Sequence, residues 1–183
     1  MTDTSHGGDG PSDLDLIDRW RRGDERAAAA LVARHAPALS RFAAASGAGA
    51  DAAEVVQDTF VRAFGALDTF RGGSSLRTWL FTIARRLLLD RRRARGRREL
   101  VEVHDDDLAT EHDALDGVVA AETARRLRCA VDRLTPTQRE VFVLRVSEGL
   151  SYREIAETVG TTEGAARVHY HNALRSVKEY LDA

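Results

Sequence analysis

The chain has 183 residues, of which 43% are hydrophobic and 31% charged, so its composition is that of an ordinary soluble protein. A formal net charge of −2 argues against a nucleic-acid binder, but this sum hides a strong segregation of charge. Residues 1–18 contain five aspartates and no lysine or arginine, residues 71–98 contain ten arginines and one aspartate, and residues 99–122 contain nine acids and no lysine or arginine. Because a partner responds to the local field, residues 71–98 are expected to attract a polyanion.

Several common classes are excluded by what the chain lacks. Cys129 is the only cysteine, so no internal disulfide can form, and we expect it to be a small buried apolar residue. No apolar run approaches the roughly 20 residues that a membrane helix needs, and the acidic start lacks the basic and apolar parts of a secretion signal. We therefore expect a cytoplasmic protein without membrane insertion.

Catalytic and cofactor-binding motifs are also missing from the sequence. No Ser/His/Asp set or metal-ligand spacing occurs, and the glycine–serine loop at residues 72–75 lacks the lysine of a phosphate-binding loop. His169 and His171 lie two positions apart in a helical pattern and so point to different faces, while His35 has no cysteine or second histidine three or four positions away. The sequence therefore predicts neither an enzyme nor a metal or cofactor site.

Helical patterns begin after a polar start and dominate the chain, which predicts an all-α fold. Residues 1–12 are polar and rich in glycine, and we expect a disordered tail there. A first helix is expected over residues 13–22, capped by Ser12 or the aspartate after it. A second helix is expected over residues 25–45, where Pro37 predicts a kink or a break.

A third helix is expected from a cap at Asp51 to about residue 67, with an apolar stripe that includes Val56, Phe60 and Ala63. The rest of its surface carries a set of mostly polar residues, namely Glu54, Gln57, Asp58, Val61 and Arg62. Such a face is usually only solvated. A docking surface is the alternative.

Residues 70–98 combine a glycine–serine loop, an apolar helix and a dense arginine run. The loop offers backbone donors and hydroxyls, aromatic rings can stack on bases, and guanidinium groups can bind phosphates, a combination that suits strands being separated. Trp79 could serve as a stacking platform, but Trp79, Leu80 and Leu87 recur at helical spacing, which is more typical of a core. The arginines have few acidic neighbours in sequence, which favours a nucleic-acid contact over a solvated face.

Residues 99–119 show no sustained period and oppose the arginine run in charge, which predicts a linker between two small helical domains, 13–98 and 120–183. The second domain is expected to open with a helix over residues 120–134. Its predicted inner stripe consists of Ala124, Leu127, Val131 and Leu134. Thr135 as N-cap and Pro136 at the first helical position then predict a helix to about Ser147.

The last stretch has the pattern of a helix–turn–helix. Ser151 is expected to cap a short helix over residues 152–159, Gly160 permits a left-handed turn, and a final helix is expected over residues 163–180. Ala156 is small where the two helices must cross. An ordinary helical hairpin is the alternative, but capping, glycine and spacing agree with a DNA reader.

The outward residues of the final helix are candidates for major-groove contacts. They are Ala165, Arg167, Val168, His171 and Asn172, and Arg145 and Tyr152 complete the predicted DNA-binding set. Arginine and asparagine can make bidentate contacts with guanine and adenine.

Three motifs in this order resemble a known family. They are DAAEVVQDTFVRAF, FRGGSSLRTWLFTIARRLLLDRRR and LTPTQREVFVLRVSEGLSYREIAETVG. From Asp13 to about Leu181 the chain is similar to bacterial sigma factors of the extracytoplasmic-function type, the minimal two-domain members of the sigma-70 family. The resemblance implies a transcription initiation factor that binds core RNA polymerase and promoter DNA, and is commonly held by an anti-sigma partner.

The same resemblance implies a role for each part. The polar face of the third helix matches the surface that binds a coiled coil of the largest catalytic subunit of the polymerase. Residues 70–98 match the reader and melter of the promoter −10 element, where a flipped base would be held. The candidate residues there are Ser74, Ser75, Leu76, Arg77, Trp79, Arg85, Arg86, Asp90, Arg91, Arg92 and Arg93. The helix–turn–helix matches the −35 reader, and the acidic linker would thread the RNA exit path.

Two departures from the family pattern change the expected promoter preference. Many relatives have asparagine at the position of Arg86, which implies a different base preference at the upstream edge of the −10 element. Relatives often have hydroxyl side chains at the positions of Ala165 and Val168, so these two residues remove hydrogen-bonding capacity and favour contact with thymine methyl groups. A free-standing helix–turn–helix regulator is the alternative function, although it would not need the loop and arginine run of residues 70–98.

Overall fold

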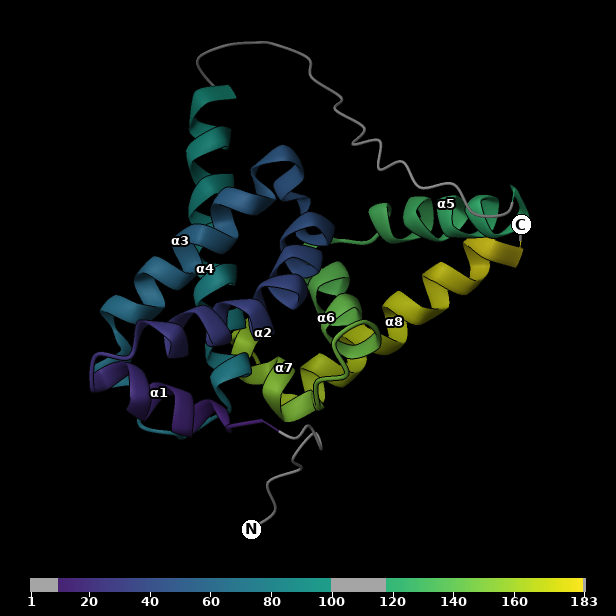
Figure 1. The fold of residues 1–183 in the computed structure, drawn as a ribbon. Coiled ribbons are helices and arrows are strands. Elements are labelled where there is room, and N and C mark those ends of the chain that lie inside the picture. The colour runs from purple at the N-terminus through teal and green to yellow at the C-terminus, as the bar shows by residue number, and fades with distance from the viewer. Residues whose placement is uncertain (1–9, 100–117, 183) are drawn as a thin grey trace. The chain divides into compact units, whose positions relative to one another are not determined.

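The structure is a computed structural model that describes residues 10–99 and 118–182 (Figure 1). Within these ranges every regular element is a helix, which confirms the all-α prediction of two helical domains, the second ending in a helix–turn–helix. Residues 1–9 of the predicted tail and 100–117 of the predicted linker lie outside the described residues. By contacts the chain divides into two compact units, with the boundary after Pro37.

The first unit contains α1 (Asp13–Arg21) and the first part of α2 (Glu25–Ala43). Ser12 caps α1 as predicted, because its hydroxyl accepts from the Asp15 amide at 3.2 Å and its own amide donates to the Asp15 carboxylate at 3.0 Å. Leu16 and Ile17 are buried. Ser12 is therefore part of the folded chain rather than of the predicted tail.

A partly buried cluster of His35, Arg34 and Asp13 joins α1 to α2 within the first unit. His35 is only 6% exposed, and its Nε2 lies 3.0 Å from a carboxylate oxygen of Asp13. Arg34 donates to the other Asp13 oxygen at 2.6 Å. Burial alone would raise the pKa of Asp13, but the hydrogen bonds and charges of His35 and Arg34 outweigh it, so the pKa is lowered. His35 is thus a structural residue.

Helix α2 and the segment that follows it differ from the prediction at Pro37 and at Asp51. The helix continues through Pro37 without a break, and the chain changes direction at Gly47, whose φ is 83°. Asp51 precedes α3 (Ala52–Gly65) but makes no side-chain cap, because its carboxylate pairs with Arg95 instead. The prediction that Asp51 caps this helix was wrong, because its carboxylate forms an ion pair with Arg95, 44 residues later in the chain.

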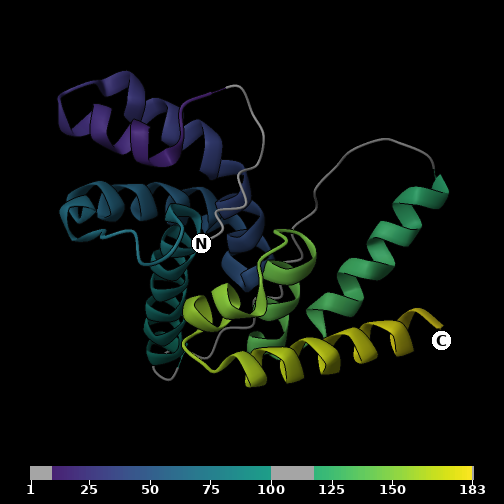
Figure 2. The same ribbon diagram turned by 90° about the horizontal axis from the view of Figure 1, so that it is seen from below.

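Helices α3 and α4 (Leu76–Glu99) pack side by side, and the 3₁₀ turn Leu67–Thr69 lies between them in the chain (Figures 1 and 2). Phe42 of α2 meets Phe81 of α4 edge to face, with 5.3 Å between ring centroids, and both rings are fully buried. Leu80 and Leu87 are also buried, which confirms the core interpretation of this stripe.

Helices α5 (Val118–Asp132), α6 (Pro136–Val146), α7 (Tyr152–Val159) and α8 (Glu163–Asp182) complete the second unit. Helix α5 lies along α8, and Arg126 donates to the carbonyl of Leu181 at 2.9 Å. Their shared core is built on five buried residues, namely Ala130, Leu134, Phe142, Ala173 and Val177.

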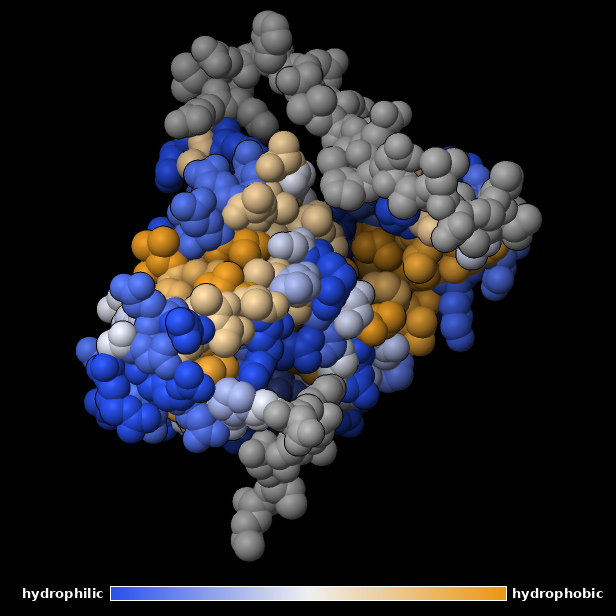
Figure 3. All heavy atoms as spheres, viewed as in Figure 1, coloured by the Kyte–Doolittle hydropathy of each residue, from blue (hydrophilic) through white to orange (hydrophobic). Residues whose placement is uncertain are grey.

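The predicted inner stripe of α5 is only partly right. Leu134 is buried and Val131 packs against the core, but Ala124 is exposed and Leu127 is 41% exposed. Apolar residues gather on the visible face where α5 and α8 meet (Figure 3). Cys129 is half-buried with a free thiol, rather than fully buried.

Within the second unit, α4 also packs against α7, and the two helices run beside each other in Figure 2. The turn after α2 contacts α6 as well. The arginine-rich helix is thus placed against the helix–turn–helix part of the same unit.

Candidate nucleic-acid and polymerase interfaces

The helix–turn–helix has the local geometry that its sequence predicts. The Ser151 hydroxyl accepts from the Glu154 amide at 3.3 Å, and the Ser151 amide donates to the Glu154 carboxylate at 2.8 Å, which completes a capping box. Gly160 ends α7 in the left-handed region, at φ 71° and ψ 46°. Ala156 and Ala166, 7% and 0% exposed, let α7 and α8 approach closely. The capping box therefore fixes the start of α7, and the turn at Gly160 sets the direction in which the chain leaves α7 for α8.

The predicted recognition residues mostly face solvent. Arg167, Val168 and His171 are exposed, with Val168 59% exposed, whereas Ala165 and Asn172 are half-buried. Arg167 pairs with Glu163 at 3.0 Å, one turn earlier on the same helix. Among the described residues, this face of α8 is therefore accessible to the major groove of DNA.

Tyr152 lies between two arginines, which sequence reasoning alone did not foresee. The guanidinium carbon of Arg145 is 4.8 Å from the centroid of the Tyr152 ring, and that of Arg167 is 5.0 Å from it. Arg145 also donates to the carbonyl of Leu150 at 2.7 Å. The stack holds one arginine from α6 and one from α8 on the same aromatic ring, so both cations are oriented before any ligand binds.

Only some of the residues that were predicted to contact DNA in and after the glycine–serine loop are exposed to solvent. Ser75 is exposed, and its hydroxyl accepts from the Thr78 amide at 3.1 Å, so it caps α4. Ser74 is half-buried, while Leu76 is only 6% exposed and belongs to the core. Trp79 is half-buried and packs on Phe70 at 5.2 Å between ring centroids.

Several arginines of α4 form ion pairs with acidic residues that are distant in sequence. The scarcity of acidic neighbours in the sequence did not predict these pairs. Arg85 and Arg92 pair with Glu140 of α6, at 2.8 and 3.2 Å. Arg93 lies 3.9 Å from Asp90 on the same helix, and both are exposed. Arg86 is exposed as well.

The polar face of α3 carries exposed groups at helical spacing. Gln57 and Arg62 are exposed, and Val61 adds an apolar side chain that is 65% exposed. Arg91 of α4 bridges Glu54 and Asp58, with 2.9 Å to each carboxylate. The hydrogen bonds that Arg91 donates to Glu54, and next those to Asp58, raise the pKa of Arg91. The bridge orders the two carboxylates while leaving both accessible, at 64% and 42% exposed.

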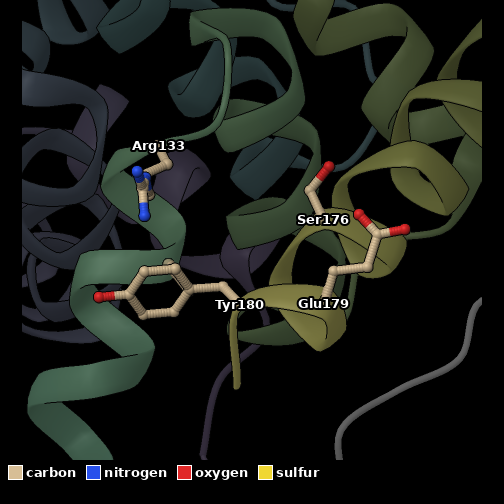
Figure 4. Close-up of a pocket in the computed structure, with 5 residues that line it drawn as sticks. Arg133, Ser176, Glu179 and Tyr180 are labelled. Atoms are coloured by element: carbon tan, nitrogen blue, oxygen red, sulfur yellow. The ribbon is translucent and has the colours of Figure 1, made fainter. Parts of the chain in front are cut away.

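A shallow depression lies between α5 and α8, lined by Ala130, Arg133, Ser176, Glu179 and Tyr180 (Figure 4). The Arg133 guanidinium lies over the Tyr180 ring, 5.2 Å from its centroid. This contact adds to the packing of α5 on α8. None of the residues predicted to bind DNA or polymerase lines it.

Among the described residues, no helix is long and apolar enough to cross a membrane. A capped helix–turn–helix with an exposed recognition face, in the same unit as an arginine-rich helix, defines a helical DNA-binding protein.

Comparison with known proteins narrows this class. The Sigma-70 region 2 family matches residues 31–98, and the Sigma-70 region 4 family matches residues 124–177. The chain is 36% identical over 149 residues to the ECF RNA polymerase sigma factor EcfG of Rhodopseudomonas palustris, covering 80% of this chain and 81% of the relative. It is 28% identical over 176 residues to the ECF RNA polymerase sigma-E factor of Escherichia coli, covering 91% and 92%.

Solved structures agree with the sequence matches. The sigma factor RpoE from Bartonella quintana, solved in complex with the anti-sigma factor NepR, has a TM-score of 0.74 and 28% identity, covering 83% of this chain and 94% of that one. CnrH, solved with the cytosolic domain of CnrY, has a TM-score of 0.69 and 29% identity, covering 93% and 97%.

The chain belongs to the extracytoplasmic-function sigma factors of the sigma-70 family. It is a transcription initiation factor that directs core RNA polymerase to promoters, and these matches favour that role over a free-standing regulator.

Proposed function

We propose that residues 13–98 bind the polymerase and open the −10 element, and that residues 120–183 read the −35 element. The observation that carries this division is the pairing of two dissimilar surfaces in one chain. A helix–turn–helix with exposed Arg167 and Val168 serves duplex DNA, while a loop followed by an arginine-rich helix serves strands that are being parted.

The −35 element is read by the exposed face of α8, with Arg145 and Arg167 held by Tyr152. Val168 and Ala165 offer methyl groups where hydroxyls are common, so contact with thymine methyls contributes to sequence preference. Replacing Arg167 by alanine is expected to weaken holoenzyme binding by about 1–3 kcal/mol and to change the preferred base at one position. Equal weakening on every sequence would make Arg167 a phosphate contact instead.

The −10 element is opened by Ser74, Ser75, Arg77 and the arginines of α4. Extruding a base costs a few kcal/mol, and no nucleotide hydrolysis is available, so stacking, hydrogen bonds and phosphate contacts must offset that cost. Arg86 and Arg93 are exposed and ready for the backbone. Because Leu76 is buried, we propose that the serines and the loop backbone, rather than the Leu76 side chain, contact the extruded base.

Core polymerase binds the face of α3 formed by Glu54, Gln57, Asp58, Val61 and Arg62. Two ordered carboxylates beside an exposed Val61 supply both charge and apolar area, a mixture found at protein interfaces.

Replacing Asp58 by arginine tests this docking face directly. The variant places two cations beside each other and is expected to reduce co-purification with core polymerase at least tenfold. Glu157→Arg, which reverses an exposed charge at the end of α7, is the matched control and should bind normally. Unaltered binding of the Asp58 variant would remove this face from the docking surface.

An anti-sigma protein is the proposed regulator, because the similar sigma factor RpoE was solved in complex with the anti-sigma factor NepR. It would act by covering the polymerase-binding faces, of which the α3 face is one. We propose that the chain works in the cytoplasm alongside the polymerase and has no catalytic activity of its own.

A further inference from the structure

Glu140 of α6 is a charged side chain held almost entirely away from water. Its side chain is 1% exposed, and its two oxygens accept from Arg85 at 2.8 Å and from Arg92 at 3.2 Å. Both arginines belong to α4, 55 and 48 residues earlier in the chain. A buried carboxylate is costly unless cations and hydrogen bonds satisfy it, so these pairs make the position of α6 against α4 specific.

Glu148, in the turn before α7, repeats this arrangement. Its side chain is 0% exposed, and Arg41 donates to both of its oxygens, at 2.9 and 3.1 Å. Arg77 of α4 donates to one of the same oxygens at 2.6 Å. The hydrogen bonds and charge of Glu148 raise the pKa of Arg41. Nearby, the hydroxyl of Thr78 donates to Glu154 of α7 at 3.2 Å.

Three of these arginines have a second proposed partner. Arg77, Arg85 and Arg92 lie in the segment that we assign to the −10 element. Carboxylate oxygens occupy the donors that phosphate oxygens would otherwise accept from. While a buried glutamate holds a guanidinium, fewer of its N–H donors and less of its charge are available to a DNA strand.

We propose that Glu140 and Glu148 form an intramolecular latch, in which the α5–α8 part competes with the DNA backbone for Arg77, Arg85 and Arg92. The inference rests on the proposed role of α4 in binding the −10 strand. In the latched state the three arginines are held against the glutamates and stay partly buried, at 34%, 18% and 33% side-chain exposure for Arg77, Arg85 and Arg92, and the protein binds DNA weakly. Separation of α4 from α6 and α7 exposes them and hydrates both glutamates.

The latch is tested on the full chain by two readouts. The first is the distance between spin labels at Ala53→Cys and Ser176→Cys, two exposed positions, in a Cys129→Ser background. The second is the affinity for fluorescent single-stranded dT20 without polymerase, at fixed salt because phosphate binding depends on it. Wild type should give one narrow distance. The double variant Glu140→Gln, Glu148→Gln should give a broad and longer distribution with about tenfold tighter dT20 binding.

Removing two negative charges could by itself favour DNA, so the control removes the same charge elsewhere. Glu157→Gln with Glu179→Gln changes two exposed carboxylates of the same part and should leave both readouts near wild type. Arg41→Gln is the sharpest variant, because Arg41 is not assigned to DNA and its side chain is 56% exposed. It removes a positive charge, yet the latch requires dT20 binding to become several-fold tighter.

Equal distances in wild type and both latch variants would overturn the proposal, as would weaker dT20 binding by Arg41→Gln. The distance readout involves neither DNA nor polymerase. It therefore judges the latch even if promoter-directed transcription, measured in parallel with wild type, shows the proposed roles of the two domains to be wrong.

Discussion

Gly160 sets the turn of the helix–turn–helix, and replacing it by alanine isolates the cost of that conformation. Its φ of 71° and ψ of 46° lie in the left-handed region, which costs a residue with a Cβ about 1–2 kcal/mol. A Cβ at this position would meet nothing within 4 Å, so no steric clash adds to that cost. The amides of Gly160 and Thr161, 2.9 and 3.0 Å from the Ala156 carbonyl, can stay bonded.

Gly160→Ala is expected to lower the free energy of unfolding by about 1–2 kcal/mol. Urea unfolding of the full chain should show this as a lower midpoint with an unchanged slope. Gly164→Ala is the matched control. Gly164 lies in the first turn of α8, has no positive φ, and a Cβ there also meets nothing within 4 Å. Gly164→Ala should leave the free energy of unfolding unchanged or raise it by up to about 1 kcal/mol, because alanine stabilises a helix relative to glycine. If both substitutions shifted the midpoint in the same direction, the left-handed turn would be refuted.

Two further predictions concern the same motif. Burial alone would raise the pKa of Glu154, but hydrogen bonds from Ser151 and Thr78 and the charge of Arg77 outweigh it and hold this pKa below its ordinary value of 4.5. The stability that Glu154 contributes is therefore full above pH 4.5 and is lost as the pH falls through the lowered pKa. Ser151→Ala should cost about 1 kcal/mol at pH 7 and flatten the acid limb of a pH–stability curve, and an unchanged limb would contradict the capping box. Tyr152→Ala should weaken −35 binding about fivefold, since each cation–π contact contributes about 0.5–1 kcal/mol, whereas Tyr152→Phe should bind normally; equal losses would assign the effect to the hydroxyl.

Local signals in the sequence were sufficient for the helix–turn–helix. The structure confirms the caps at Thr135 and Ser151 and the turn at Gly160. These features could be predicted because their hydrogen bonds join residues no more than five positions apart. Such contacts depend on residue types that the sequence displays directly. The family motifs added the order of the two domains.

Tertiary charge pairing could not be predicted in the same way. Asp51 was expected to cap α3, but Arg95, 44 residues later, takes its carboxylate. The arginines of α4 have few acids beside them in sequence, yet Glu140 reaches two of them across the fold. Periodicity also misplaced Leu127, because it gives the angle of a stripe around α5 but not which neighbour covers it.

The most direct test of the whole account is transcription from a promoter library by core RNA polymerase with and without the purified protein. The account predicts new transcripts with defined starts only when both are present, and weak binding of duplex DNA by the protein alone. Tight, sequence-specific binding of duplex DNA without polymerase, together with no added transcripts in its presence, would contradict it.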